Sequence, residues 1–99
     1  MPYKIINTSL AKKTLINNVN YLLREFGKSQ VDAFLKKVEE VTSLLEVDPY
    51  VFQRHNDNTY NILVVKQVTM YYEVKLKTVQ ILLFWNNYKN PKTLIELIE

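Results

Sequence analysis

The chain has 99 residues, of which 47% are hydrophobic, 12% aromatic and 23% charged. This composition argues against a disordered chain and favours one folded domain, which we expect to span residues 1–99. The sequence has no cysteine and one histidine, which excludes disulfide bonds and cysteine-ligated metals, and we expect no cofactor. The net charge of +3 suits an approach to nucleic acid or to an acidic protein, although it serves solubility equally well.

Nothing in the sequence predicts insertion into a membrane. There is no run of about 18 apolar residues. The opening Met-Pro-Tyr-Lys leads directly into a strand-like segment, without the apolar core of a signal peptide. We therefore expect a cytoplasmic protein without a membrane partner.

The chain begins with a predicted strand and a predicted helix. Residues 3–7 form a short segment centred on two isoleucines, and residues 7–9 offer side-chain oxygens that can cap a helix. The only glycine, Gly27, stands where a left-handed cap would end that helix. The apolar positions at helical spacing are Leu10, Leu15, Val19, Leu22, Leu23 and Phe26.

A second helix is expected from Ser29, because Asp32 lies three positions on in a pattern close to a capping box. Pro49 ends this helix. The link to the first helix is so short that the two should pack as an antiparallel hairpin. The apolar stripe comprises Val31, Phe34, Leu35, Val38, Val41 and Leu45, whereas Lys36, Lys37, Glu39 and Glu40 face solvent.

Three segments in the second half predict strands, at residues 60–66, 69–75 and 78–85. All are rich in β-branched and aromatic residues, and the short links between them require antiparallel hairpins. Residues 49–59 are expected to be irregular, and residues 88–99 to form a tail with a short helix or strand. Successive side chains of a strand point to opposite faces of the sheet, so Tyr71 and Tyr72 should lie on opposite faces. In the last strand one face should carry Val79, Ile81, Leu83 and Trp85, and the other Gln80, Leu82 and Phe84.

The predicted fold is therefore α+β in the order β-α-α-β-β-β. It has an N-terminal strand, an antiparallel helical hairpin and a three-stranded antiparallel meander. Because a bare sheet edge invites aggregation, the first strand is expected to join the sheet. That gives about four strands, with the helical hairpin packed on one face.

Several short motifs in the second half recur, in the same order, in one known family. They are Tyr60-Asn-Ile-Leu-Val-Val-Lys66, Met70-Tyr-Tyr-Glu-Val74, Phe84-Trp85-Asn86-Asn87 and Asn90-Pro91. In this order they resemble the RelE/ParE toxins of bacterial toxin–antitoxin pairs. The resemblance covers the chain from Tyr3 to about Leu94. It implies a toxin of this fold that arrests growth and that a cognate antitoxin neutralises.

The resemblance implies one of two activities. ParE-like members bind and inhibit DNA gyrase, whereas RelE-like members cleave messenger RNA on the ribosome. We favour the ParE-like interpretation, because Thr69 and Tyr88 stand where many relatives carry arginine. A metal-independent endoribonuclease that acts on ribosome-bound mRNA, and a non-toxic interaction domain of the same fold, are the alternatives.

Candidate site residues follow from these readings. RNA cleavage without a metal needs cations for the phosphate and groups that transfer protons. The residues that could serve are Arg54, His55, Lys66, Tyr88, Lys89 and Lys92, and each also has an ordinary explanation as a loop, surface or packing residue. An amphipathic antitoxin segment is expected in a groove between the helices and the sheet, and the tail at 88–99 could wait for such a partner. Partner contacts are expected from Lys12, Lys13, Tyr72, Trp85 and Tyr88.

Overall fold

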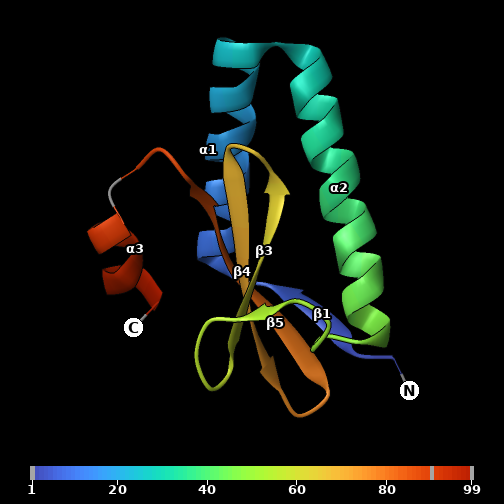
Figure 1. The fold of residues 1–99 in the computed structure, drawn as a ribbon. Coiled ribbons are helices and arrows are strands. Elements are labelled where there is room, and N and C mark those ends of the chain that lie inside the picture. Colours follow the sequence, from blue (N-terminus) through green and yellow to red (C-terminus); the bar gives the residue numbers. More distant parts are fainter. Residues whose placement is uncertain (1, 90, 99) are drawn as a thin grey trace.

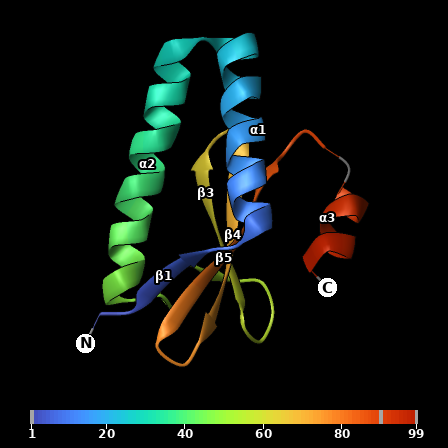
Figure 2. The same cartoon turned by 180° about the vertical axis from the view of Figure 1, so that it is seen from behind.

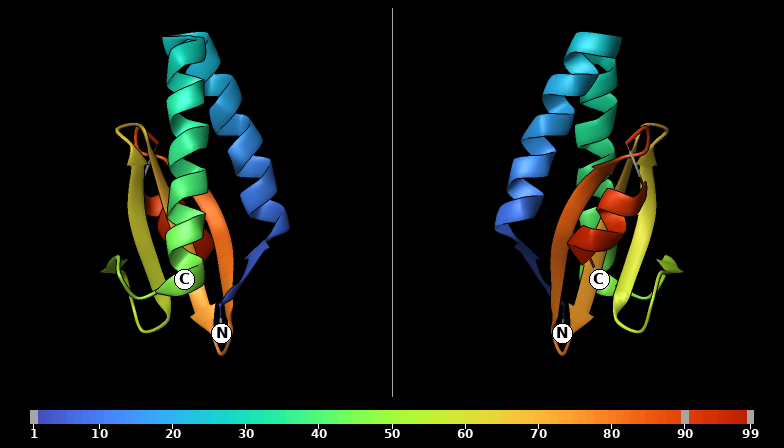
Figure 3. Two further views of the ribbon diagram at one scale, coloured as in Figure 1. Left: turned by 90° about the vertical axis from the view of Figure 1, so that its right-hand side faces the viewer. Right: turned by 90° about the vertical axis from the view of Figure 1, so that its left-hand side faces the viewer.

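Two helices pack against one face of a five-stranded sheet, and a third helix lies on the opposite face (Figures 1 and 3). The computed structural model describes residues 2–89 and 91–98. The α+β class and the order of strand, hairpin and meander are confirmed. β2 is an addition in the expected loop, and α3 shows that the tail forms a helix, one of the two expected alternatives. The elements are β1 (Lys4–Asn7), α1 (Ser9–Phe26), α2 (Lys28–Val47), β2 (Gln53–Arg54), β3 (Thr59–Val65), β4 (Val68–Lys75), β5 (Thr78–Asn86) and α3 (Pro91–Ile98).

The strands are arranged in the order β1-β5-β4-β3-β2. The meander of β3, β4 and β5 is antiparallel, as the short links require. β1 joins the sheet as expected and runs parallel to β5, with Lys4 opposite Thr78 and Asn7 opposite Ile81. The sheet has five strands and not about four, because two residues of the expected loop pair with the start of β3.

The junction between the helices differs from the prediction. α2 begins at Lys28 and not at Ser29, and no side-chain hydrogen bond caps it, so the expected capping box with Asp32 is absent. Gly27 alone links the helices, with a φ of 94° and a ψ of 178°. Its φ is positive as expected, but its extended ψ lies outside the left-handed helical region. A one-residue reversal between two helices explains this conformation, because the chain must change direction at a single pair of dihedral angles.

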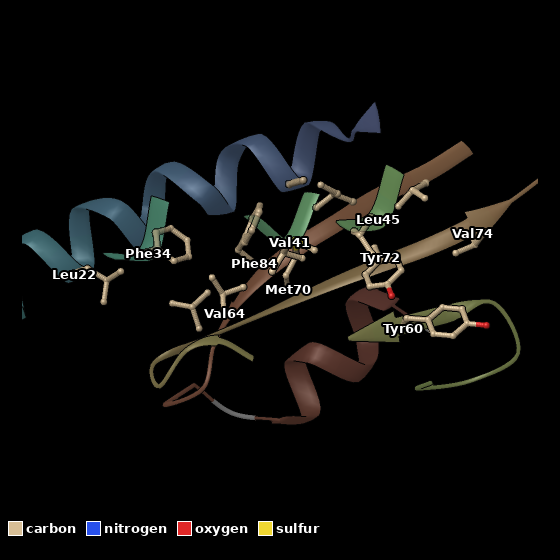
Figure 4. Close-up of a cluster of buried hydrophobic side chains, with 14 of the residues drawn as sticks. Leu22, Phe34, Val41, Leu45, Tyr60, Val64, Met70, Tyr72, Val74 and Phe84 are labelled. Atoms are coloured by element: carbon tan, nitrogen blue, oxygen red, sulfur yellow. The ribbon is translucent and has the colours of Figure 1, made fainter. Parts of the chain in front are cut away.

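The space between the helical hairpin and the sheet is filled by the main core (Figure 4). Phe34 of α2 meets Phe84 of β5 edge-on, with ring centroids 5.9 Å apart. The groove expected in this space is therefore occupied by the protein's own side chains. Three residues of the predicted apolar stripes, Leu23, Phe26 and Leu35, are exposed. The buried faces centre instead on Ala11, Asn18 and Leu22 in α1 and on Val31, Phe34, Val41 and Leu45 in α2.

A β-bulge in β5 changes which side chains face the core. Tyr71 pairs with Leu83 whereas Tyr72 pairs with Ile81, so Leu82 is an extra residue between them. Strict alternation along β5 was therefore the wrong expectation. Val79, Ile81 and Phe84 face the helical hairpin, whereas Leu83 and Trp85 face α3 together with Tyr71 and Leu94. The expectation that Tyr71 and Tyr72 lie on opposite faces is confirmed.

Side chains of α1 take the place of a strand beside the second half of β5. β1 pairs with β5 only as far as Ile81. Beyond that point, the Thr8 hydroxyl lies 2.8 Å from Ile81 O and 3.0 Å from Leu82 O. Phe84 N donates to Thr14 Oγ1 over 2.9 Å, and Asn18 Nδ2 donates to Phe84 O over 2.9 Å. These bonds satisfy backbone groups that would otherwise be left unpaired and fix α1 against the sheet.

None of the helices within residues 2–89 and 91–98 combines the length and the apolar character needed to cross a lipid bilayer.

Candidate functional site

The residues proposed for RNA cleavage lie at two ends of β3. Arg54 and His55 precede the strand, and Lys66 follows it. A strand of seven residues is about 20 Å long, so these groups are not gathered around one phosphate. Lys89 lies near the Lys66 end, because the loop that carries it is bonded to the β3–β4 turn.

At the first end, Arg54 organises its own loop. Its guanidinium donates to Asn56 O over 3.1 Å and to Asp57 O over 3.3 Å, and it lies 3.5 Å from the Asp57 carboxylate. The ion pair is exposed, so it contributes little to stability. The ring of His55 lies edge-on to Tyr71, with centroids 5.6 Å apart. This contact brings His55 to the sheet face opposite the helical hairpin.

At the second end, two asparagines fix the loop that leaves β5. Asn87 accepts from the Thr69 hydroxyl over 2.8 Å, and its side-chain amide donates to Lys66 O over 3.1 Å. The Asn86 side chain accepts from the backbone N–H of Tyr88 over 2.9 Å. Both asparagines belong to the motif that carries the resemblance, and here they hold the backbone in place. Tyr88 and Lys89 are exposed.

The remaining candidates are spread over the molecule. Lys92 is an exposed residue of α3, and Lys12 and Lys13 are exposed on α1. Trp85 is nearly buried under α3, and Asn90 of the motif lies outside the described residues. No cluster of three or more possible metal-ligating side chains occurs among the described residues.

Tyr72 is fully buried, and its hydroxyl donates to Pro49 O over 2.7 Å. Burial raises the pKa of Tyr72 well above its ordinary value, and the neighbouring Tyr60 and Asp48 raise it further. Burial also raises the pKa of Tyr71. Neither phenol is matched to proton transfer near neutral pH. Tyr72 also has no exposed surface to offer a partner, so its role in this structure is in the core.

Three exposed residues of α1, namely Lys12 and the apolar Ile16 and Leu23, lie on one face, which we call the α1 outer stripe. Spacings of four and seven residues place these three on the same side of a helix. Ile16 is 61% exposed and Leu23 is 53% exposed. An apolar stripe next to a lysine is a surface suited to an amphipathic partner carrying acidic residues.

Comparison with solved structures identifies the architecture. A chain of the chromosomal ParDE TA system from P. aeruginosa superposes with a TM-score of 0.68 and 14% sequence identity, over 85% of this chain and 95% of that chain. The chain has the RelE/ParE toxin fold. No protein-family model and no curated protein sequence matches it.

Two further structures share the RelE/ParE toxin fold with this chain. The YoeB dimer from Staphylococcus aureus has a TM-score of 0.58 and 11% identity, over 89% of this chain and 100% of that chain. The YoeB/ParE toxin from Agrobacterium tumefaciens has a TM-score of 0.58 and 9% identity, over 86% of this chain and 99% of that chain. The fold predicted from the sequence motifs is thereby confirmed.

Proposed function

We propose that this protein is the toxin of a type II toxin–antitoxin pair and that it acts in the ParE-like manner, by binding a cellular target. DNA gyrase is the target that the ParE resemblance offers. The observation that carries the proposal is the match to a chain of a ParDE TA system along 95% of that chain's length. Toxins of this fold extend over nearly the whole of the present chain.

The arrangement of charged and titratable groups favours binding over RNA cleavage. A general acid and a general base must each reach the reacting group within about 3 Å. Here His55 and Lys66 stand at opposite ends of a seven-residue strand, and Arg54 is engaged with its own loop. The raised pKa of Tyr71 makes it a poor substitute. A surface that binds a target needs none of these groups to converge.

The antitoxin is proposed to lie along the α1 outer stripe. It would cover Ile16 and Leu23 with apolar side chains and meet Lys12 and Lys13 with acidic ones. The net charge of +3 would speed association with an acidic partner. Exchange of Ile16 and Leu23 for serine is expected to abolish co-purification with the antitoxin and to leave the protein folded.

Induced expression in a bacterial host tests this proposal. Growth should stop, co-expression of the antitoxin should restore it, and total mRNA should stay intact. The variants Arg54→Ala, His55→Ala and Lys66→Ala should arrest growth as strongly as the parent protein. Lys36→Ala, which changes an exposed lysine on α2, is the matched control.

The alternative is a ribosome-dependent endoribonuclease. The contact between His55 and Tyr71 favours it, because it brings an imidazole to the sheet face on which Trp85 also lies. Cleavage of mRNA in a purified translation system, lost in His55→Ala or Lys66→Ala, would establish that reading. Harmless expression without any antitoxin would instead indicate a non-toxic interaction domain.

A further inference from the structure

A cavity of about 290 Å³ opens where α1, the second half of β5 and α3 meet. It exists because β1 ends opposite Ile81, which leaves the rest of β5 without a neighbouring strand on that side. α1 stands beside this part of β5 on one face, and α3 approaches from the other face (Figure 2). The volume lies just below the range for drug-sized ligands, about 300–1,000 Å³, and suits a smaller molecule.

The charged groups of the cavity have one sign. Arg24 of α1 and Lys89 of the β5–α3 loop line it, and none of the described lining residues is acidic. The Arg24 guanidinium lies 5.9 Å from the centre of the Tyr21 ring, which holds it at the cavity wall. Its Nε donates to Glu25 over 3.1 Å, but this ion pair is exposed, and the two terminal nitrogens carry four further donors. The cavity is therefore complementary to an anion.

Part of the cavity wall is apolar. Leu83 and Trp85 of β5 lie on one side, and Leu97 of α3 lies on another. Leu97 is 49% exposed although it adjoins these buried side chains, so an apolar group placed in the cavity would remove further surface from water. Asn17 and Thr93 add hydrogen-bonding groups to the wall.

We propose that this cavity binds a small organic anion in which a carboxylate or a phosphate is attached to an apolar ring. The ring would rest on Leu83, Trp85 and Leu97, and the charge would lie between Arg24 and Lys89. The site is separate from the α1 outer stripe, and the inference does not depend on the proposed toxin function.

Trp85 reports directly on this site because it is the only tryptophan of the chain. The protein is titrated with phenylacetate and with phenyl phosphate while the fluorescence of Trp85 and the amide NMR signals of residues 83–86 are followed. Neutral 2-phenylethanol tests the ring alone, and acetate and inorganic phosphate test the charge alone. We expect saturable binding of one or both ring anions, at least tenfold tighter than that of any of the three controls. Which of the two anions binds tighter identifies the charged group.

Variants locate the charge. Arg24→Ala and Lys89→Ala should each weaken binding of the ring anion about tenfold, the usual effect of losing one charge-assisted contact. Lys36→Ala and Arg54→Ala change exposed cations away from the cavity and should leave the affinity unchanged. The proposal is overturned if 2-phenylethanol binds as tightly as the anions, if nothing saturates, or if all four variants behave alike.

Discussion

Asn18 is a polar residue in the apolar face of α1, and the structure gives it a definite task. It is almost completely buried, and its amide donates to Thr14 O over 2.8 Å and to Phe84 O over 2.9 Å. The sequence indicated that Asn18 is buried, since this polar residue stands between Leu15 and Leu22 in the predicted apolar stripe. Its partner was not predictable, because it lies 66 positions away on a strand whose neighbours were unknown.

The exchange Asn18→Leu should destabilise the protein. Leucine preserves the helix and much of the volume but leaves Phe84 O buried without this donor. The free energy of unfolding is expected to fall by about 1–3 kcal/mol, measured by urea denaturation. Asn20→Leu, at an exposed position two residues further on and on the other side of α1, should change it by less than about 0.5 kcal/mol. Equal effects of the two exchanges would refute the role assigned to Asn18.

Leu76 is in an unfavourable backbone conformation. It lies in the two-residue turn between β4 and β5 with a φ of 52°, and it is 93% exposed. Asparagine tolerates positive φ better than leucine does. The exchange Leu76→Asn should therefore raise the free energy of unfolding by about 0.5–1 kcal/mol, measured by urea denaturation. Lys77→Asn, at the next position, should bring no such gain.

Tyr72 should make the protein sensitive to alkali. Its pKa is raised in the folded state, so the fold favours the neutral phenol, and above about pH 10 the unfolded chain alone loses the proton. The stabilising contribution is complete below that pH and is lost as the pH rises further. Urea midpoints measured from pH 8 to 11 should fall more steeply for the parent protein than for Tyr72→Phe. The exposed Tyr88→Phe should behave like the parent protein.

Helices and strands with a regular pattern of apolar residues could be predicted from the sequence. The β-bulge and the pairing of β1, which depend on contacts between distant segments, could not. Helical spacing, Gly27 and the short links between strands gave both long helices and all three strands of the meander. The bulge at Leu82 left no signal, because β5 is apolar on both faces and either alternation satisfies the sequence. The parallel pairing of β1 also depends on where the helical hairpin returns the chain.

For α3 too, the element could be predicted but its packing partners could not. Its apolar residues predicted a helix or a strand, but only the bulge in β5 turns Leu83 and Trp85 towards it. Neither the cavity nor the anchoring role of Asn86 and Asn87 could be foreseen without that geometry. Asn86 and Asn87 of the motif therefore do have a role, but it is to hold the loop after β5 in place and not to take part in chemistry.

Loosening α3 should expose Trp85 without unfolding the sheet. Among the side chains of α3 that the structure describes, Leu94 packs against Tyr71, Leu83 and Trp85. In Leu94→Ala, the emission of Trp85 should shift to longer wavelength while the urea midpoint changes little, because the main core lies on the other face. Thr93→Ala, at the adjacent exposed position, should leave the emission unchanged. A large fall in the midpoint of Leu94→Ala would show that α3 is integral to the cooperative fold.

The whole molecule offers separate surfaces for the separate tasks proposed above. The helical hairpin carries the α1 outer stripe, on which we propose that the antitoxin binds, and the core beneath the hairpin is closed. The opposite face carries α3 and the cavity beside it. Arg54 and His55 are separated from Lys66 by the length of β3. This separation is why we propose that the protein binds a large target and does not cut RNA.

Supercoiling by purified DNA gyrase is the most direct test. The purified protein is added to gyrase, relaxed plasmid and ATP, and in parallel to ribosomes translating a defined mRNA. We predict that supercoiling is inhibited in proportion to the protein added, that the antitoxin restores it, and that the mRNA remains whole. Unchanged supercoiling together with cut mRNA would contradict the account.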